Sequence, residues 1–130
     1  MSSQLVWELV KKNHAFLRKN AAVNGALFSG EPGNLANKHS YKYSGLANRA
    51  STVDVALAPS GDAIVVAKSS KKSKAGKLAG SIVNKNGRRS NHAAGAEAAS
   101  TRPDLKRAAQ ARASALTKGI RTSKAAASDE

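Results

Sequence analysis

Residues 51–68 read "STVDVALAPSGDAIVVAK", and this stretch decides how the chain can fold. Val53, Val55 and Leu57 alternate with smaller or more polar residues, which is the period of a strand that buries one face. The sequence "PSGD" at 59–62 has the chemistry of a tight turn, and "AIVVAK" then returns as a second strand-forming segment. The pattern therefore predicts a β-hairpin with strands at 51–58 and 62–68.

The residues before this hairpin predict a helix and two more strands. Residues 3–19 space their apolar side chains as one face of an amphipathic helix, in which Trp7 packs on other residues. A short strand is expected at 26–29, followed by a loop rich in glycine and proline. The aromatic segment "SYKYSGL" at 40–46 alternates and also predicts a strand.

The function of this aromatic segment has two interpretations. In a strand, Tyr41 and Tyr43 would share one face, with Lys42 on the other. If the tyrosines face the helix they belong to the core, which we favour, and if they face outward they could stack on bases. Gly45 would end the strand or allow another backbone to approach closely.

After the hairpin the composition becomes basic and rich in alanine. Residues 69–81 carry few large apolar side chains and predict a flexible basic loop. A helix is expected at 87–99, and a second helix begins at Pro103 and ends near Gly119. The apolar stripe of the second helix is narrow, so it could dock on the globular domain, on RNA or on another protein, and the sequence does not choose.

The charge of the chain is large and unevenly distributed. Its 130 residues carry 22 Lys and Arg against 8 Asp and Glu, a formal net charge of +14. Residues 1–67 hold seven of these basic groups and four of the acidic ones, so the excess is concentrated in residues 68–130. We therefore expect a foldable front half and a back half that binds a polyanion such as nucleic acid.

Several classes of site have little support in the sequence. The chain has no cysteine, and its three histidines lack the spacing of metal ligands, so neither a thiolate site nor a metal site is expected. No apolar run reaches the length that spans a bilayer, and no membrane partner is expected. The eight acids form no convincing catalytic pair, so we expect no enzyme, no cofactor and no small-molecule substrate.

Phosphate contacts are the chemistry that the basic residues favour. Lysine and arginine side chains neutralise phosphates and release counterions, whereas the alternative is a solvated, solubilising surface. The candidate RNA-binding residues are Lys42, Asn48, Arg49, Lys68, Lys71, Lys72, Lys74, Lys77, Lys85, Arg88, Arg89, Arg102, Lys106, Arg107, Arg112, Lys118 and Arg121.

Four segments resemble one family in the same order along the chain. They are "LVWELVKKNHAFLRKN" near the start, "FSGEPGNLANKHSYKYSGLANR" at 28–49, "VNKN" at 83–86 and "RPDLKRAAQARASALTKG" at 102–119. Together they resemble the eukaryote-specific 28e family of the large ribosomal subunit. The chain departs from the family's pattern just before "RPDL", where it reads "AAGAEAAST" in place of larger apolar residues and an aromatic.

The resemblance implies an α+β fold, with the N-terminal helix packed on a small antiparallel sheet, followed by a basic loop and a helical extension. The corresponding division is a globular domain at 1–68, a basic linker at 69–86, an RNA-binding helical extension at 87–121 and a disordered tail at 122–130. The resemblance also implies a structural protein of the cytoplasmic ribosome that passes through the nucleolus during assembly. Its partners would be large-subunit ribosomal RNA and neighbouring ribosomal proteins.

Two other functions are compatible with a basic, alanine-rich chain. One is a chromatin protein resembling a linker histone, although such tails contain little arginine and this chain has arginines from residue 88 onward. The other is an adaptor whose basic helix binds an acidic protein, and this binding would survive nuclease treatment.

Overall fold

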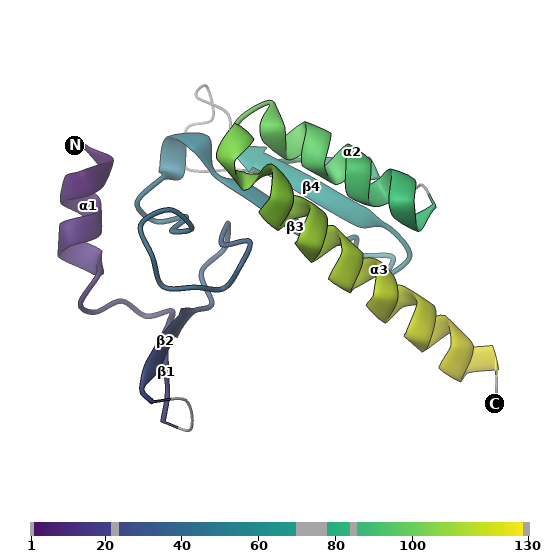
Figure 1. The fold of residues 1–130 in the computed structure, drawn as a ribbon, viewed down its shortest axis with the longest axis horizontal. Coiled ribbons are helices and arrows are strands. Elements are labelled where there is room, and N and C mark those ends of the chain that lie inside the picture. The colour runs from purple at the N-terminus through teal and green to yellow at the C-terminus, as the bar shows by residue number, and fades with distance from the viewer. Residues whose placement is uncertain (1, 22–23, 70–77, 84–85, 129–130) are drawn as a thin grey trace.

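The computed structural model describes residues 2–21, 24–69, 78–83 and 86–128. Its elements, in chain order, are α1 (Ser3–Val10), β1 (Leu17–Asn20), β2 (Ala26–Ser29), the 3₁₀ turn η1 (Arg49–Ser51), β3 (Val53–Leu57), β4 (Ile64–Ser69), β5 (Leu78–Val83), α2 (Gly87–Ala99), the 3₁₀ turn η2 (Pro103–Leu105) and α3 (Lys106–Ser128). The predicted α+β class is confirmed, with two small antiparallel sheets and helices at both ends of the chain (Figure 1).

The predicted hairpin forms the centre of the larger sheet. β3 and β4 pair antiparallel from Val53 opposite Lys68 to Leu57 opposite Ile64, which confirms the prediction. The turn between them closes with the Ala58 amide donating to the Ala63 carbonyl at 2.9 Å. β5 adds a third strand beside β4. It occupies 78–83, inside the segment 69–86 that the sequence predicts as a flexible basic linker, so that prediction is wrong for these residues.

The main core lies between this sheet and the two C-terminal helices. Val53, Val55 and Val66 point to one face of the sheet and are fully buried there. α2 and α3 lie side by side across this face (Figure 1), and their alanines 94, 98, 109 and 113 are fully buried against it. The apolar stripe of α3 therefore packs on the globular structure, which answers the question that the sequence leaves open.

The two helices differ in how well the sequence predicts their ends. α2 spans the predicted residues 87–99. α3 continues through Gly119 to Ser128, so the expected end at Gly119 and the disordered tail are wrong for residues 122–128. Glycine costs only about 1 kcal/mol inside a helix, and alanines 125–127 favour the helix beyond it.

The predicted helix at 3–19 is wrong beyond Val10. Residues 17–20 instead form β1, which pairs with β2 from Leu17 opposite Ser29 to Asn20 opposite Ala26. The turn that joins them contains Asn24 and Gly25, both with positive φ, at 46° and 72°. An Asn-Gly pair favours such turns, so the local hairpin outweighs helix propensity here. The predicted strand at 26–29 is confirmed.

The aromatic segment at 40–46 is a series of turns, and the predicted strand is wrong. The amides of Tyr43 and Ser44 both donate to the Ser40 carbonyl, at 3.2 and 3.0 Å, which coils the backbone. The two tyrosines therefore do not share a face. Tyr43 packs against the main core, whereas the ring of Tyr41 contacts Trp7 in an edge-on geometry with centroids 6.2 Å apart.

Glycine at position 45 permits the close approach that the sequence suggests. A Cβ atom at Gly45 would lie 2.3 Å from the carbonyl oxygen of Pro32, closer than any such contact allows. Buried Glu31, one residue earlier, accepts a hydrogen bond from the Asn34 amide at 3.0 Å. The two contacts hold the loop between β2 and η1 as a folded unit.

α1 packs on this loop, where the sequence predicts packing on a sheet. The Ser3 and Tyr41 hydroxyls are 2.7 Å apart, and the rings of Trp7 and His39 are in contact at a tilt of 41°, with centroids 5.0 Å apart. His39 also bonds through Nε2 to the Lys11 carbonyl at 2.7 Å. These contacts come from one face of the helix, and no residue of α1 is fully buried.

Candidate nucleic-acid interface

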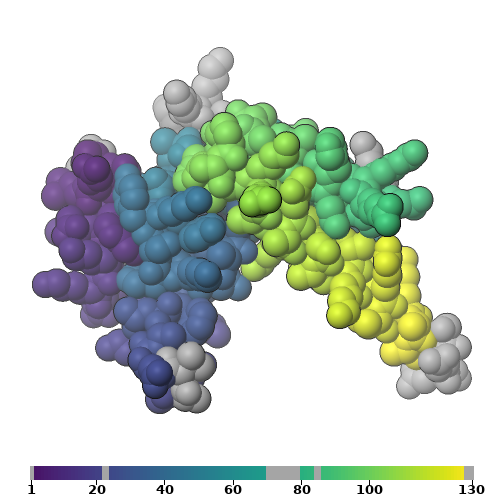
Figure 2. Space-filling model, in the orientation of Figure 1, coloured from purple at the N-terminus to yellow at the C-terminus, as the bar shows by residue number. Residues whose placement is uncertain are grey.

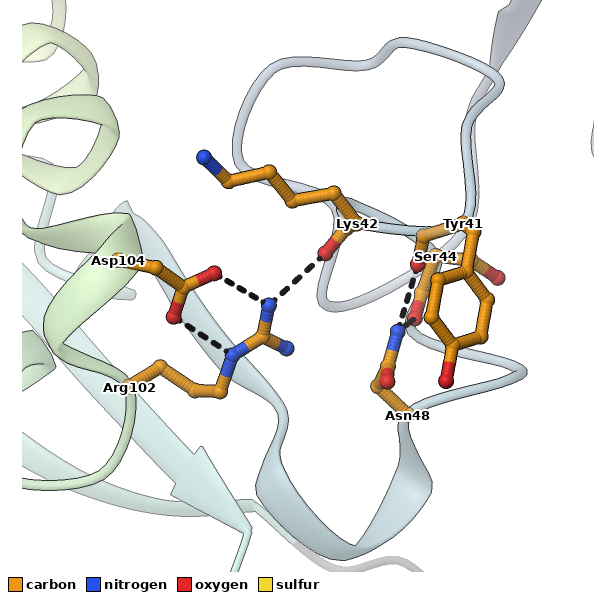
Figure 3. A network of polar contacts seen from close by, with 6 residues as sticks. All are labelled: Tyr41, Lys42, Ser44, Asn48, Arg102 and Asp104. Atoms are coloured by element: carbon orange, nitrogen blue, oxygen red, sulfur yellow. Dashed lines mark hydrogen bonds and ion pairs between the residues drawn. The ribbon is translucent and has the colours of Figure 1, made fainter. Parts of the chain in front are cut away.

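Arg102 lies between α2 and η2 and joins this segment to the loop between β2 and η1 (Figure 3). Its guanidinium donates to both carboxylate oxygens of Asp104, with Nε at 2.9 Å and a terminal nitrogen at 2.7 Å. A terminal nitrogen also donates to the Lys42 carbonyl at 3.1 Å. Only 17% of the Arg102 side chain is exposed. This predicted RNA-binding residue therefore makes three hydrogen bonds within the protein and is paired with an acidic side chain.

The ion pair shifts both of its members toward their charged forms. Hydrogen bonding from Arg102 holds the pKa of the Asp104 carboxyl below its ordinary value, although partial burial opposes the shift. The same hydrogen bond raises the pKa of Arg102. A lowered carboxyl pKa stabilises the folded state above the pKa of the unfolded chain, and this contribution is lost as the pH falls through the folded pKa.

Replacing Asp104 should therefore have a consequence that depends on pH. We expect Asp104→Asn to lower the free energy of unfolding by about 0.5 kcal/mol at neutral pH, because the carboxylate is partly exposed and solvent screens the pair. The difference from wild type should begin to shrink near pH 4, the ordinary pKa of an aspartate, and vanish only at a pH below the lowered pKa of Asp104, where the wild-type carboxyl is protonated too. Urea unfolding at both pH values measures it.

Asp62→Asn provides the control, since the pair of Asp62 with Lys124 is 63% exposed on both sides. At neutral pH, Asp62→Asn should lower the free energy of unfolding by less than Asp104→Asn does. An Asp104→Asn penalty that stayed constant into acid would contradict the role of the ion pair.

Three more of the predicted residues bond within the protein. The Asn48 amide donates to the Tyr41 and Ser44 carbonyls at 2.7 and 3.1 Å, which secures the turns around it (Figure 3). The Lys68 ammonium is 2.5 Å from a carboxylate oxygen of Glu97, so it ties β4 to α2. Arg112 donates from Nε to the Val55 carbonyl at 3.1 Å and fastens α3 to β3.

A second set of predicted residues is exposed on the surface. None of them forms an ion pair with a carboxylate in the part of the chain that the structure describes. Lys42 only approaches an aromatic ring, with its ammonium 5.7 Å from the centroid of Tyr43. These exposed cations are Lys42, Arg49, Arg88, Arg89, Lys106, Arg107, Lys118 and Arg121.

Five predicted lysines lie outside the described residues, namely Lys71, Lys72, Lys74, Lys77 and Lys85. Conversely, the structure exposes basic side chains that the sequence interpretation left out of the candidate set. Arg18 and Lys19 are exposed on β1, and Lys38 is exposed in the loop that follows β2. Their positive charge was the available signal. The predicted helix at 3–19, however, placed Arg18 and Lys19 at its C-terminal end, where they suit the helix dipole.

The described residues offer few other kinds of site. They contain no group of three or more His, Cys, Asp or Glu side chains that could hold a metal ion. Within the same ranges, no helix has the length and apolarity that crossing a bilayer requires. The surface carries exposed cations and also exposed apolar side chains, which include Leu5 and Leu9 of α1 and Ile82 of β5.

The chain is similar to known ribosomal proteins over most of its length. The model of the Ribosomal L28e protein family matches residues 5–119. A protein of Dictyostelium discoideum named large ribosomal subunit protein eL28 is 53% identical over 72 residues, which are 55% of this chain and 51% of that protein. The protein of the same name from Caenorhabditis elegans is 46% identical over 61 residues, 47% of each chain. The matched part of the chain thus spans about half the length of these curated relatives.

Proposed function

Because the chain belongs to the ribosomal L28e protein family, we propose that it is a structural constituent of the cytosolic large ribosomal subunit that binds ribosomal RNA and supports translation. The family is one of ribosomal structural proteins and is not an enzyme family. The observation that carries the RNA-binding part is the set of eight exposed predicted cations without a described acidic partner. Cations left unpaired on a folded surface favour a polyanion.

The mechanism that this surface supports is charge neutralisation on a rigid frame. Each phosphate contact releases counterions, so affinity falls steeply as salt is raised. Three of the predicted cations hold parts of the protein together through the bonds described above. Arg102 joins the loop between β2 and η1 to the segment before α3, Lys68 joins β4 to α2, and Arg112 joins α3 to β3. We propose that these three residues position the exposed cations and leave the phosphate contacts to them.

Neighbouring ribosomal proteins are the second class of partner that we propose. Leu5 and Leu9 lie one turn apart on α1 and are 49% and 68% exposed. Apolar side chains gain nothing from phosphates, so a protein surface suits them better than RNA does. Passage through the nucleolus during assembly belongs to the same proposal.

Sedimentation of a tagged form of the protein from a eukaryotic lysate tests the proposed function. Magnesium chelation separates the subunits, and the protein should then migrate with the large subunit at moderate salt and be released by nuclease. Migration with chromatin would favour the histone-like function instead. A light species that nuclease leaves unchanged would favour the adaptor, and either result would overturn the proposal.

A further inference from the structure

The antiparallel packing of α2 and α3 gathers cations from both helices at one end of the helix layer. Gly95 of α2 lies against Gln110 of α3, and Gly87 lies against Arg121, near the C-terminal part of α3 (Figure 1). A Cβ atom at Gly87 would be 2.6 Å from a terminal nitrogen of Arg121. Arg88 and Arg89 follow Gly87 directly on α2, and Lys118 precedes Arg121 by about one turn on α3. These four exposed residues therefore lie at the same end of the helix layer, and we call them the basic end.

A hollow of about 300 Å³ lies at the basic end, between both helices and the β3–β4 turn. Its polar lining includes Asn86, Thr117 and the Arg121 side chain. Asp62 and Lys124 also line it, and they neutralise each other at 3.0 Å. The net charge of the lining side chains is thus positive, and it comes from Arg121.

We infer that the basic end seats a phosphate of the RNA backbone, with the Arg121 guanidinium as its principal donor. This inference rests on the proposed function. An arginine side chain can bind two phosphate oxygens through two parallel hydrogen bonds. The charge of Arg121 is not neutralised by a carboxylate of any described residue. Arg88 and Lys118 flank it and contact the adjoining phosphates. Four neighbouring cations repel one another when unbound, and a polyanion removes this repulsion.

The opposite face of the sheet has a different chemistry. Ala56, Val65 and Ile82 stand in register across β3, β4 and β5 on the face away from the helices. Ile82 is 69% exposed, and this row carries no cation. A phosphate backbone finds no donor on this row, whereas the basic end offers several. Figure 2 shows the start of α2 beside the C-terminal half of α3 on the outer surface of the molecule.

The first test removes two positive charges at the basic end. Binding of purified large-subunit ribosomal RNA is measured by filter retention across a salt series. Arg88→Gln with Arg121→Gln should weaken binding roughly tenfold at moderate salt and reduce the salt slope by about 2. The control, Lys12→Gln with Lys19→Gln, removes the same charge from exposed positions of the N-terminal region and should weaken binding much less. Thermal unfolding verifies that both variants fold.

The second test moves the guanidinium without changing the charge. In Gly87→Ala the new methyl group would displace the end of the Arg121 side chain, which is flexible enough to shift without unfolding the protein. We expect a loss of affinity of about threefold, a small change because arginine can partly readjust. Gly119→Ala adds the same methyl group to open space on α3 and should leave affinity unchanged.

The outcomes separate this inference from the proposed function. If the two double variants weaken binding equally, or if Gly87→Ala binds as tightly as wild type, RNA binding depends on total charge and the phosphate seat is wrong, while the proposed function stands. If the wild-type protein itself fails to bind the RNA, the proposed function fails and the inference fails with it.

Discussion

Gly45→Ala should lower the midpoint of thermal unfolding by about 10 °C, which corresponds to roughly 3 kcal/mol for a chain of this size. The added Cβ atom would meet the carbonyl oxygen of Pro32 at 2.3 Å and the Cα atom of Gly33 at 3.3 Å. Both neighbours are backbone atoms, so no side chain can rotate away. The loop between β2 and η1 must open at this point. α1 then loses the surface on which it packs.

Calorimetry or circular dichroism measures this effect, and Gly119→Ala is the matched control. Position 119 has open space around the new methyl group and lies inside α3, so alanine should raise stability by about 0.5–1 kcal/mol. The two substitutions are chemically identical and have opposite expected signs. Equal midpoints for Gly45→Ala and wild type would show that the loop does not pack as described.

Ala109→Leu should destabilise the fold by about 2–3 kcal/mol. Ala109 is fully buried where α3 meets the sheet, in the same cluster as Val53, Val55 and Ala113. The small side chains let the helix lie close to the strands, and a leucine would force the two layers apart. The change should also loosen the bond that Arg112 makes with β3, because that bond depends on the same separation.

Ala111→Leu is the control for this variant. It makes the same substitution on the exposed face of the same helix, where helix propensity changes little and no layer is displaced. Chemical unfolding should therefore place Ala111→Leu within about 0.5 kcal/mol of wild type. A similar loss in both variants would mean that the alanine interface is not tightly packed.

Buried alanines of α2 explain a departure of the sequence from the pattern of its family. Residues 93–101 lack the larger apolar residues that the resemblance leads one to expect before "RPDL". Ala94 and Ala98 are nevertheless fully buried, and Gly95 lies against the Gln110 side chain. Small residues here bring α2 close to α3, so the core forms by close approach where larger side chains would hold the helices apart.

Local signals gave correct predictions where a segment's structure depends on its own residues. The hairpin at 51–68 combines strand periodicity with strong turn chemistry, and both act within a few residues. α2 could likewise be placed from its alanine content. The predicted helix was wrong beyond Val10 because two local signals compete there. Residues 11–19 have helical spacing, but the turn at Asn24 and Gly25 pairs 17–20 with β2 instead.

The sequence by itself determined the α+β class, the central hairpin, the family and the excess of positive charge, because each depends on residue type or on spacing along the chain. Only the tertiary structure decided which cations remain free for a partner. Arg102 and Arg121 are both arginines of the basic half, but Arg102 bonds to Asp104 and the Lys42 carbonyl, whereas Arg121 borders an open hollow. This difference depends on which backbone and side-chain groups lie nearby in space, and the contact with Lys42 joins residues 60 positions apart in the sequence.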